Sequence, residues 1–244
     1  MTSTCKVYLL PCVIDEHAYK TIPAYITTAI KDCEVLFAEN ERTARRFLKQ
    51  LWKFYLPEQE IIIDNYEWFT IHKAEQEVQS TFRQKLKEGK NIGIISEAGC
   101  PGVADPGQLL IGIAQEMGAI IKPLVGPSSI LLALMASGMN GQQFQFTGYL
   151  PIDATARIKA IKDLEAESKK KSCTQIFIET PYRNNQLIEV LLKTCNTSTQ
   201  LCIAADITGE NEWIKTKTIA EWKNEKVDIH KRPAIFLLYV DERR

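Results

Sequence analysis

The stretch that says most about this chain runs from Ile94 to Gly107 and reads IISEAGCPGVADPG. Its start continues an apolar run that predicts a β-strand, and its end leads into a helical pattern near Pro106. In open α/β sheets, ligands bind beyond the carboxyl ends of the strands. Small residues there let backbone groups approach a ligand closely, and Asp105 is expected to cap the next helix. An ordinary tight connection remains the alternative.

A second loop of the same kind joins a predicted strand to a helix N-terminus and reads PLVGPSS, from Pro123 to Ser129. Its free amides and its two hydroxyls suit a carboxylate or another polar ligand edge, although helix capping alone would also explain them. Neither loop has the GxGxxG or GxxxxGK[ST] spacing. A dinucleotide or a nucleoside triphosphate is therefore not the expected ligand.

Strand and helix patterns alternate around these loops, which favours an α/β fold with a parallel sheet in the first half. There we expect strands at 6–10, 35–38, 61–63, 91–95 and 119–124, and helices at 21–32, 42–55, 73–88 and 106–117. A further helix is expected at 127–137, with Pro127 in its first turn, bridging the two halves. After Gly141 we expect strands at 144–147, 175–179, 201–205 and 233–240, and helices at 154–170 and 182–194. The predicted domains are an N-terminal α/β domain, 1–124, and a C-terminal mixed α+β domain, 125–244.

The amino-acid composition excludes several classes of protein. The 244 residues are 45% hydrophobic and 25% charged, and the formal net charge is zero, so attraction to nucleic acid must come from a local patch. The longest apolar runs, 130–136 and 234–240, are shorter than the roughly 20 residues that span a bilayer, and no signal-peptide pattern is visible. Seven cysteines without a CxxC pair, and three histidines, predict no metal site. We expect reduced thiols in a cytoplasmic protein without membrane contact.

One predicted helix, 42–55, carries a local basic patch. Five cations share about 100° of arc: Arg42, Arg45, Arg46, Lys49 and Lys53. Aromatic and leucine side chains, namely Phe47, Leu48, Leu51, Phe54 and Tyr55, occupy the other side. Such a stripe suits RNA phosphates, with a plain solvated helix face as the alternative.

Several segments, in order along the chain, match one known family. The pattern S-D-A-G-[TC]-P-x-x-x-D-P-G is matched by Ser96–Pro101 and Asp105–Gly107, and a PxPGPSS-like element by Pro123–Ser129. Further matches are Val7–Pro11, Ala38–Arg42 (resembling A-E-D-T-R), Gly148–Pro151 and Ile178–Arg183 (resembling Y-E-S-x-H-R). The chain thus resembles the tetrapyrrole methylase superfamily, the class III S-adenosylmethionine (SAM) methyltransferases. It is most similar to the ribosomal RNA small subunit methyltransferase I group, which methylates a cytidine 2′-oxygen of 16S rRNA.

The resemblance implies two α/β domains with SAM in the cleft between them, usually in a homodimer, and a role in rRNA processing with rRNA or the small ribosomal subunit as partner. Cofactor contacts in the family are largely to the backbone. Carried over by position, the residues around SAM are Leu10, Pro11, Glu97, Ala98, Gly99, Cys100, Pro101, Ser128, Ser129, Ile178, Ala204, Asp206, Pro233 and Ala234. Cys100 is interpreted as a packing residue.

Transfer to a ribose 2′-hydroxyl requires the loss of a proton. Three carboxylates near predicted strand ends are candidate bases, Glu39, Glu179 and Asp206, each with a surface or capping role as the alternative. The predicted substrate contacts are phosphate binding by Arg183 and by the basic residues Arg42, Arg45, Arg46 and Lys49, and ring stacking on Tyr182.

The chain also departs from the family pattern. Cys12–His17 lacks the glycine of the family's T-P-I-G-N-L loop, and 64–67 matches its H-D-H-N-E segment only in part. In place of A-R-E-[LI]-T-K, the segment 204–209 has Ala205, Asp206 and Gly209 at the Arg, Glu and Lys positions. The cofactor loops are therefore kept better than the substrate-side elements. A tetrapyrrole methyltransferase of the precorrin type and a non-catalytic SAM-binding protein stay open as alternatives.

Overall fold

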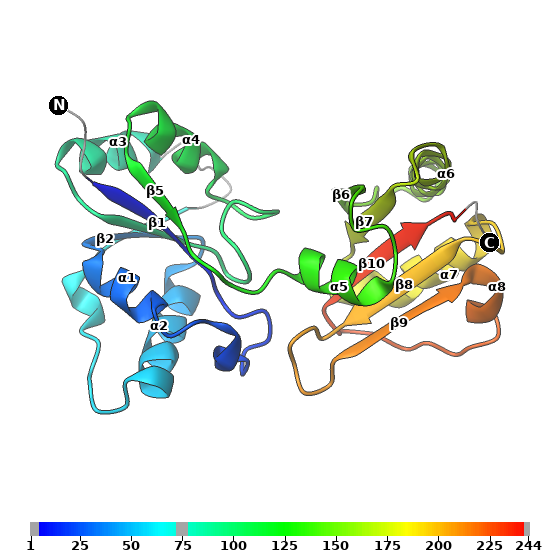
Figure 1. Cartoon of the computed structure of the whole chain (residues 1–244), viewed down its shortest axis with the longest axis horizontal. Helices are drawn as coiled ribbons and strands as arrows, with labels where there is room; N and C mark the ends of the chain where they lie inside the picture. Colours follow the sequence, from blue (N-terminus) through cyan, green and yellow to red (C-terminus); the bar gives the residue numbers. More distant parts are fainter. Residues whose placement is uncertain (1–4, 72–77, 242–244) are drawn as a thin grey trace. The chain divides into compact units, whose positions relative to one another are not determined.

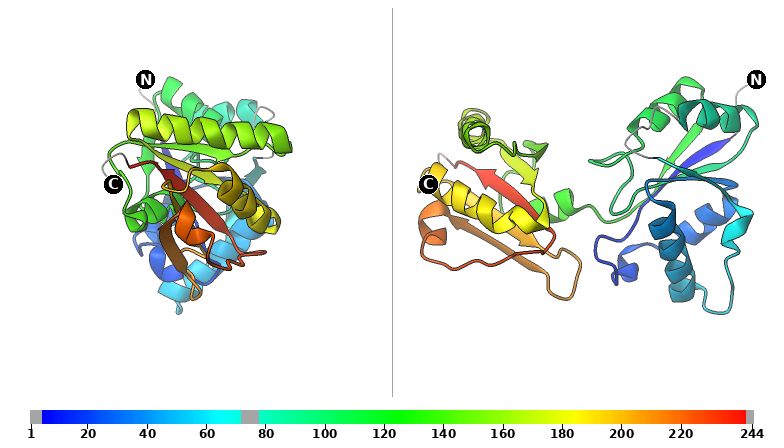
Figure 2. Two further views of the ribbon diagram at one scale, coloured as in Figure 1. Left: turned by 90° about the vertical axis from the view of Figure 1, so that its right-hand side faces the viewer. Right: turned by 180° about the vertical axis from the view of Figure 1, so that it is seen from behind.

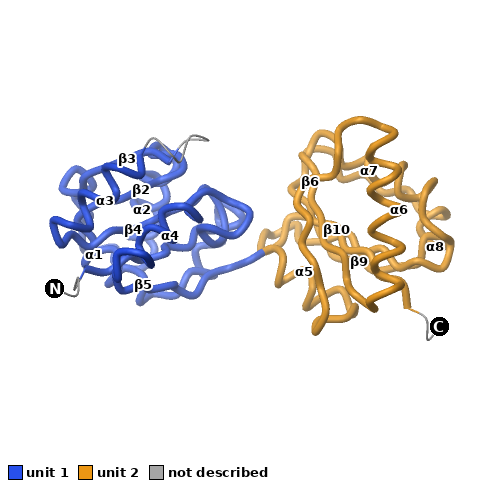
Figure 3. Tube along the Cα trace, turned by 90° about the horizontal axis from the view of Figure 1, so that it is seen from above, with its two compact units in different colours: residues 1–128 blue, residues 129–244 orange. Residues whose placement is uncertain are grey.

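The computed structural model describes residues 5–71 and 78–241 (Figure 1). The chain divides into two compact units, residues 1–128 (unit 1) and 129–244 (unit 2) (Figure 3). The division follows Ser128, whereas the predicted domains are 1–124 and 125–244.

Unit 1 alternates strands and helices. Its strands are β1 (Lys6–Leu10), β2 (Val35–Ala38), β3 (Glu67–Thr70), β4 (Ile92–Ile95) and β5 (Ile120–Pro123). Its helices are α1 (Ile26–Asp32), α2 (Glu41–Tyr55), α3 (Gln79–Lys87) and α4 (Gln108–Glu116), with short 3-10 turns η1 (Tyr19–Thr21) and η2 (Ile63–Asn65). The sheet order is β3-β2-β4-β1-β5, and each pairing is parallel. All the strands therefore end at one edge.

Helices cover both faces of this sheet, α1 and α2 on one and α3 and α4 on the other (Figure 1, Figure 2). Successive side chains of a strand point to opposite faces. Accordingly Leu36 of β2 packs in the core with Ile30 of α1, whereas Phe37 packs with Phe82 of α3 and Leu110 of α4. A strand buried on both faces reads as an unbroken apolar run, which explains the sequence Val-Leu-Phe-Ala of β2.

Unit 2 is built on a mixed sheet of order β6-β7-β10-β8-β9. Its strands are β6 (Phe144–Tyr149), β7 (Thr174–Ile178), β8 (Gln200–Ala205), β9 (Trp213–Thr218) and β10 (Ala234–Tyr239). Its helices are α5 (Ser129–Ser137), α6 (Ala154–Lys171), α7 (Asn184–Thr194) and α8 (Ile219–Trp222), with the 3-10 turn η4 (Pro181–Arg183). The β6–β7 pairing is parallel, and β10 and β9 pair antiparallel with their neighbours. One core joins the sheet to α6, α7 and α8, and the opposite face packs against Ala133 and Leu134 of α5.

Four local predictions are wrong. Residues 61–63 form no strand: Ile62 is 62% exposed, and the edge strand is β3, a few residues later. The helix expected over 21–32 begins at Ile26, after Pro23. The helix expected from Pro127 begins at Ser129 and belongs to unit 2. Asp105 does not cap α4, whose N-cap is Gly107 without a side-chain hydrogen bond.

Two elements of unit 2 were not predicted, β9 and α8. The strand β9 has the sequence WIKTKT and lies at the edge of the sheet beside β8, so four of its six residues are polar or charged. The helix α8 has four residues, too few for a helical period, although its capping box between Thr218 and Glu221 is a recognisable start signal. Of the helix predicted over 73–88, residues 73–77 lie outside the described residues, and the described part is α3.

Within the described ranges, no helix is both long and apolar enough to cross a membrane. The seven cysteines are free thiols, Cys100 partly exposed and the other six buried.

Candidate functional site

The loops that follow β1, β2, β4 and β5 lie together at one edge of unit 1, here called the unit 1 strand edge (residues 10–13, 39–43, 96–105 and 124–127). Backbone hydrogen bonds link them: Cys12 N donates to Gly99 O (2.8 Å), and Glu39 N donates to Ile95 O (3.0 Å). Parallel strands make this unavoidable, because their carboxyl ends share an edge. The predicted cofactor residues Leu10, Pro11 and 97–101 therefore gather within unit 1.

Backbone closeness shapes this edge. A Cβ atom added to Gly126 would lie 2.1 Å from Cβ of Pro11, so only glycine lets the two loops pack against each other. Gly99 has φ +66°, a left-handed conformation that favours glycine. Cys100 is directed at the carbonyl oxygen of Pro127 (Sγ to O 3.5 Å), and burial raises the pKa of its thiol. These contacts agree with a packing role for Cys100.

Three carboxylates, Glu39, Glu97 and Asp105, meet at this edge and are called the carboxylate cluster below. Glu39 Oε2 accepts a hydrogen bond from Glu97 N (2.9 Å), and Glu97 Oε1 accepts one from Thr43 Oγ1 (3.1 Å). Burial, followed by the charges of Glu39 and Glu97, raises the pKa of Asp105 to about 6. Across residues 5–71 and 78–241, no Lys or Arg forms an ion pair with these three, and no His, Cys, Asp and Glu group could hold a metal ion.

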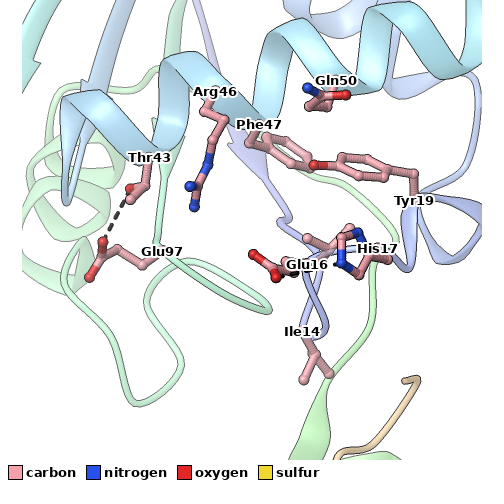
Figure 4. Close-up of a pocket in the computed structure, with 10 residues that line it drawn as sticks. Ile14, Glu16, His17, Tyr19, Thr43, Arg46, Phe47, Gln50 and Glu97 are labelled. Atoms are coloured by element: carbon pink, nitrogen blue, oxygen red, sulfur yellow. Dashed lines mark hydrogen bonds and ion pairs between the residues drawn. The ribbon is translucent and has the colours of Figure 1, made fainter. Parts of the chain in front are cut away.

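A pocket of about 320 Å³ adjoins the cluster and is also formed by unit 1 alone (Figure 4). It is lined by Val13, Ile14, Glu16, His17, Tyr19, Thr43, Arg46, Phe47, Gln50 and Glu97. The ring of Tyr19 stacks on Phe47, with centroids 6.1 Å apart and planes 17° apart. Arg46 projects from α2 into this space without an ion pair among the described residues. The pocket thus combines an unpaired guanidinium with carboxylates and a stacked aromatic pair.

Helix α2 keeps most of its predicted basic stripe. Arg42, Arg46, Lys49 and Lys53 are exposed and have no ion pair within the described part of the chain. Arg45 differs: it donates to Glu41 Oε1 (2.8 Å) and Asp64 Oδ1 (2.7 Å) and lies 4.8 Å from the Trp68 ring centroid. Its guanidinium is therefore engaged within unit 1, and four of the five cations face solvent.

A second group of predicted residues meets at one edge of unit 2, where β7 and β8 end and β10 begins (the unit 2 strand edge, residues 178–183, 204–208 and 230–234). Ile178 pairs with Ile235, Ala205 pairs with Ala234, and Asp206 N donates to Pro233 O (2.9 Å). Antiparallel β10 lies between β7 and β8, which brings the three segments together. Ser128 is the last residue of unit 1, and Ser129 is the first residue of α5 in unit 2.

The two candidate bases of unit 2 are both bound by arginine. Buried Glu179 accepts hydrogen bonds at Oε1 from Arg183 Nε (3.0 Å) and Nη2 (2.6 Å). Asp206 Oδ2 accepts one from Arg232 Nε (2.6 Å). Arg183 is therefore directed at Glu179, and Tyr182 beside it is 70% exposed. Arg232 was missed in the sequence because its partner is 26 residues away; the raised pKa of Asp105 was missed because it depends on two other loops.

Comparison with known proteins identifies the family. The family model for tetrapyrrole (corrin/porphyrin) methylases matches residues 23–223. This chain belongs to the tetrapyrrole methylase family. The methyltransferase CobJ has a similar fold, with 15% identity and a TM-score of 0.61 over 97% of this chain and 94% of that one. Uroporphyrin-III-C-methyltransferase from Thermus thermophilus also matches, with 15% identity and a TM-score of 0.53 over 96% and 92%. The predicted α/β fold class and the predicted family are confirmed.

Curated members of the tetrapyrrole methylase family include closer relatives. Ribosomal RNA small subunit methyltransferase I of Escherichia coli O157:H7 is 32% identical over 181 residues, 72% of this chain and 61% of that protein. The protein of the same name from Bacillus subtilis (strain 168) is 28% identical over 222 residues, 90% and 70% of the two chains. The chain thus spans about three fifths of the first of these relatives.

Proposed function

We propose that this protein is a SAM-dependent methyltransferase of small-subunit rRNA that methylates a ribose 2′-oxygen. The observation that carries the proposal is the unit 1 strand edge: a small-residue loop beside three carboxylates that have no ion pair with a described Lys or Arg, in a member of the tetrapyrrole methylase family. Relatives named ribosomal RNA small subunit methyltransferase I support the choice of RNA as substrate.

The unit 1 strand edge fits this cofactor chemically. SAM carries a sulfonium and an ammonium group, and the raised pKa of Asp105 marks a place where negative charge is crowded and unneutralised. Ala98 is exposed and Gly99 and Cys100 are partly exposed, so a ligand can approach the backbone there, where side chains are small or absent. The contacts of Ser128, Ser129, Ile178, Ala204, Asp206, Pro233 and Ala234 with the cofactor stay predictions.

The bound cofactor supplies an activated methyl group, so the protein's tasks are to orient the 2′-hydroxyl and to accept its proton. Among the three candidate bases we favour Glu39. It is half-buried, and its side chain accepts a hydrogen bond from the backbone amide of Glu97. Protonation of Glu179 or Asp206 would weaken an existing ion pair with Arg183 or Arg232, so we assign these two carboxylates a positioning role.

Helix α2 supports RNA as the substrate. Its four exposed cations, Arg42, Arg46, Lys49 and Lys53, form a row without carboxylate partners in the described chain, as phosphate binding requires. Arg46 also lines the pocket beside the carboxylate cluster, so we propose that it holds a phosphate close to the acceptor nucleotide.

We further propose a cytoplasmic homodimer that makes no membrane contact. The free cysteines favour a reducing compartment, and the family resemblance favours the dimer. Sedimentation of the purified protein tests the oligomeric state.

The function is tested by calorimetric titration with SAM and S-adenosylhomocysteine, followed by transfer of a labelled methyl group to purified small ribosomal subunits. Wild-type protein should bind both compounds and label the RNA. Glu39→Gln removes one of the three charges of the carboxylate cluster, so it should weaken cofactor binding only modestly and lose transfer by about 10²-fold or more. The matched control Glu58→Gln alters an exposed glutamate outside the strand edge and should change neither. Absence of SAM binding and of transfer, with subunits present, would contradict the proposal.

A further inference from the structure

An exposed aromatic ring with basic neighbours stands at the unit 2 strand edge. Tyr182 is 70% exposed. The ammonium of Lys231 lies over its ring, 5.8 Å from the centroid, and the His230 ring meets it edge-on at 6.1 Å and 76°. We call these three side chains the Tyr182 platform.

The backbone beneath the platform is held firmly. Lys231 N donates to Pro181 O (3.0 Å), which joins the 229–232 loop to η4. The buried amide of Asn184 donates to Arg232 O (2.7 Å) and also to Ile229 O (3.4 Å). The ring and the lysine are therefore presented on a preorganised surface, which lowers the entropic cost of binding a ligand.

Lys231 has φ +63°, a left-handed conformation that costs energy for a residue with a side chain. Glycine would fit this backbone better, so lysine at this position costs some stability. A strained non-glycine residue held by surrounding hydrogen bonds is typical of functional positions.

Lys231 differs from the other cations around the platform in having no ion pair among the described residues. Arg183 is paired with Glu179, and Arg232 with Asp206. Asp228 accepts hydrogen bonds from Asn185 Nδ2 (2.8 Å) and His230 N (3.0 Å). Lys231 has no ion pair in the described chain, so its ammonium is available to a phosphate.

We propose that the Tyr182 platform binds an unpaired RNA nucleotide, whose base stacks on Tyr182 while Lys231 contacts its phosphate. Aromatic rings with adjacent cations are the usual means of holding single strands, because every base has a π-face. In a duplex the bases are already stacked on each other, so the ring favours single-stranded RNA. The side chain that lies over the Tyr182 ring, Lys231, is a cation, which favours a polyanion over an apolar protein surface as the occupant. The inference rests on the proposed RNA substrate and gives unit 2 its own contact with that substrate.

The test measures binding of a fluorescein-labelled single-stranded 12-nucleotide RNA to the full-length protein by anisotropy. Loss of one stacked base predicts about 5- to 150-fold weaker binding by Tyr182→Ala, from 1–3 kcal/mol at 1.4 kcal/mol per tenfold. Tyr182→Phe keeps the ring and should stay within about twofold of wild type. The matched control is Tyr149→Ala, which removes a tyrosine of unit 2 that is 62% exposed on β6 and should leave the affinity unchanged.

The cation is tested with Lys231→Gly, which suits the left-handed backbone and removes only the side chain. Its thermal midpoint should equal or exceed that of wild type. The slope of log K against log salt should become shallower by about 0.7, the value for one phosphate contact with a single strand.

Equal affinities of wild type and Tyr182→Ala, an equal loss in Tyr149→Ala, or failure of the wild-type protein to bind the oligonucleotide would overturn the inference. Equally effective competition by duplex RNA would overturn it too. Methyl transfer by the wild type, measured separately, distinguishes the two proposals: transfer without Tyr182-dependent binding refutes only the platform, and Tyr182-dependent binding without transfer refutes only the enzyme.

Discussion

Replacing Asp105 by Asn should make the unliganded protein more stable at neutral pH. The pKa of Asp105 is raised from 3.8 to about 6 by burial and by the charges of Glu39 and Glu97. Two pKa units correspond to about 3 kcal/mol. Because Asp105 is only half-buried, solvent screening reduces this penalty to about 1–2 kcal/mol. Asn removes the charge and should recover that amount of unfolding free energy.

The raised pKa of Asp105 also sets how the stability gain of Asp105→Asn depends on pH. The folded state holds the Asp105 proton more tightly than the unfolded state, so the penalty is complete above pH 6 and is relieved as the pH falls toward 4. Urea unfolding should therefore show Asp105→Asn more stable than wild type at pH 7.5, with the difference fading near pH 4. In a Glu97→Gln background the gain should shrink by at least about 0.5 kcal/mol. A pH-independent difference, or destabilisation at pH 7.5, would refute this reasoning.

Three further predictions concern packing, buried charge and RNA. Gly126→Ala places a Cβ against Pro11 and should cost about 2–3 kcal/mol of unfolding free energy. Gly112→Ala lies in an exposed and open helical position and should gain about 0.5–1 kcal/mol. Chemical denaturation of both variants tests this, and the reverse order of stability would contradict it. Glu165 is buried and accepts hydrogen bonds from Asn196 and Thr199, so Glu165→Ala should cost about 3 kcal/mol in chemical denaturation. Glu165→Gln should cost less, because it keeps the volume and one acceptor oxygen; equal costs would contradict this reasoning. Arg46→Ala should weaken binding of single-stranded RNA and make the slope of log K against log salt shallower by about 0.7. Arg45→Ala should change neither, because Arg45 is ion-paired with Glu41 and Asp64. An equal effect of the two substitutions would show that Arg45 binds RNA despite these ion pairs.

All the interior strands were predicted from the sequence, as were the edge strands β5 and β6, whereas the edge strands β3 and β9 were missed. Both β1 and β2 are apolar runs covered on both faces, and their observed bounds equal the predicted ones. The edge strands β3 and β9 are half-exposed, so their side chains show no such run. The three isoleucines at 61–63 resemble a strand in sequence, yet Ile61 and Ile62 lie in the loop before η2. Ile63 is the first residue of η2 and the one of the three that is buried.

The candidate site also has a part that the sequence predicts and a part that it does not. The small-residue loops could be predicted from the sequence, because a close approach of backbone segments requires Gly, Ala or Pro within the loop itself. Which charged side chains form ion pairs could not be predicted from the sequence, because their partners come from distant parts of the chain. Arg45 is removed from the basic stripe by Asp64, and Asp206 is neutralised by Arg232. Local spacing cannot encode such long-range pairs.

The most direct test of the account identifies the methylated atom. Small ribosomal subunits that lack the modification are incubated with SAM and the protein, and the rRNA is then digested and its nucleosides separated by mass spectrometry. We predict a single new 2′-O-methylated nucleoside, absent with Glu39→Gln and present with Glu58→Gln. A base-methylated nucleoside, or none at all from a protein that binds SAM, would contradict the account.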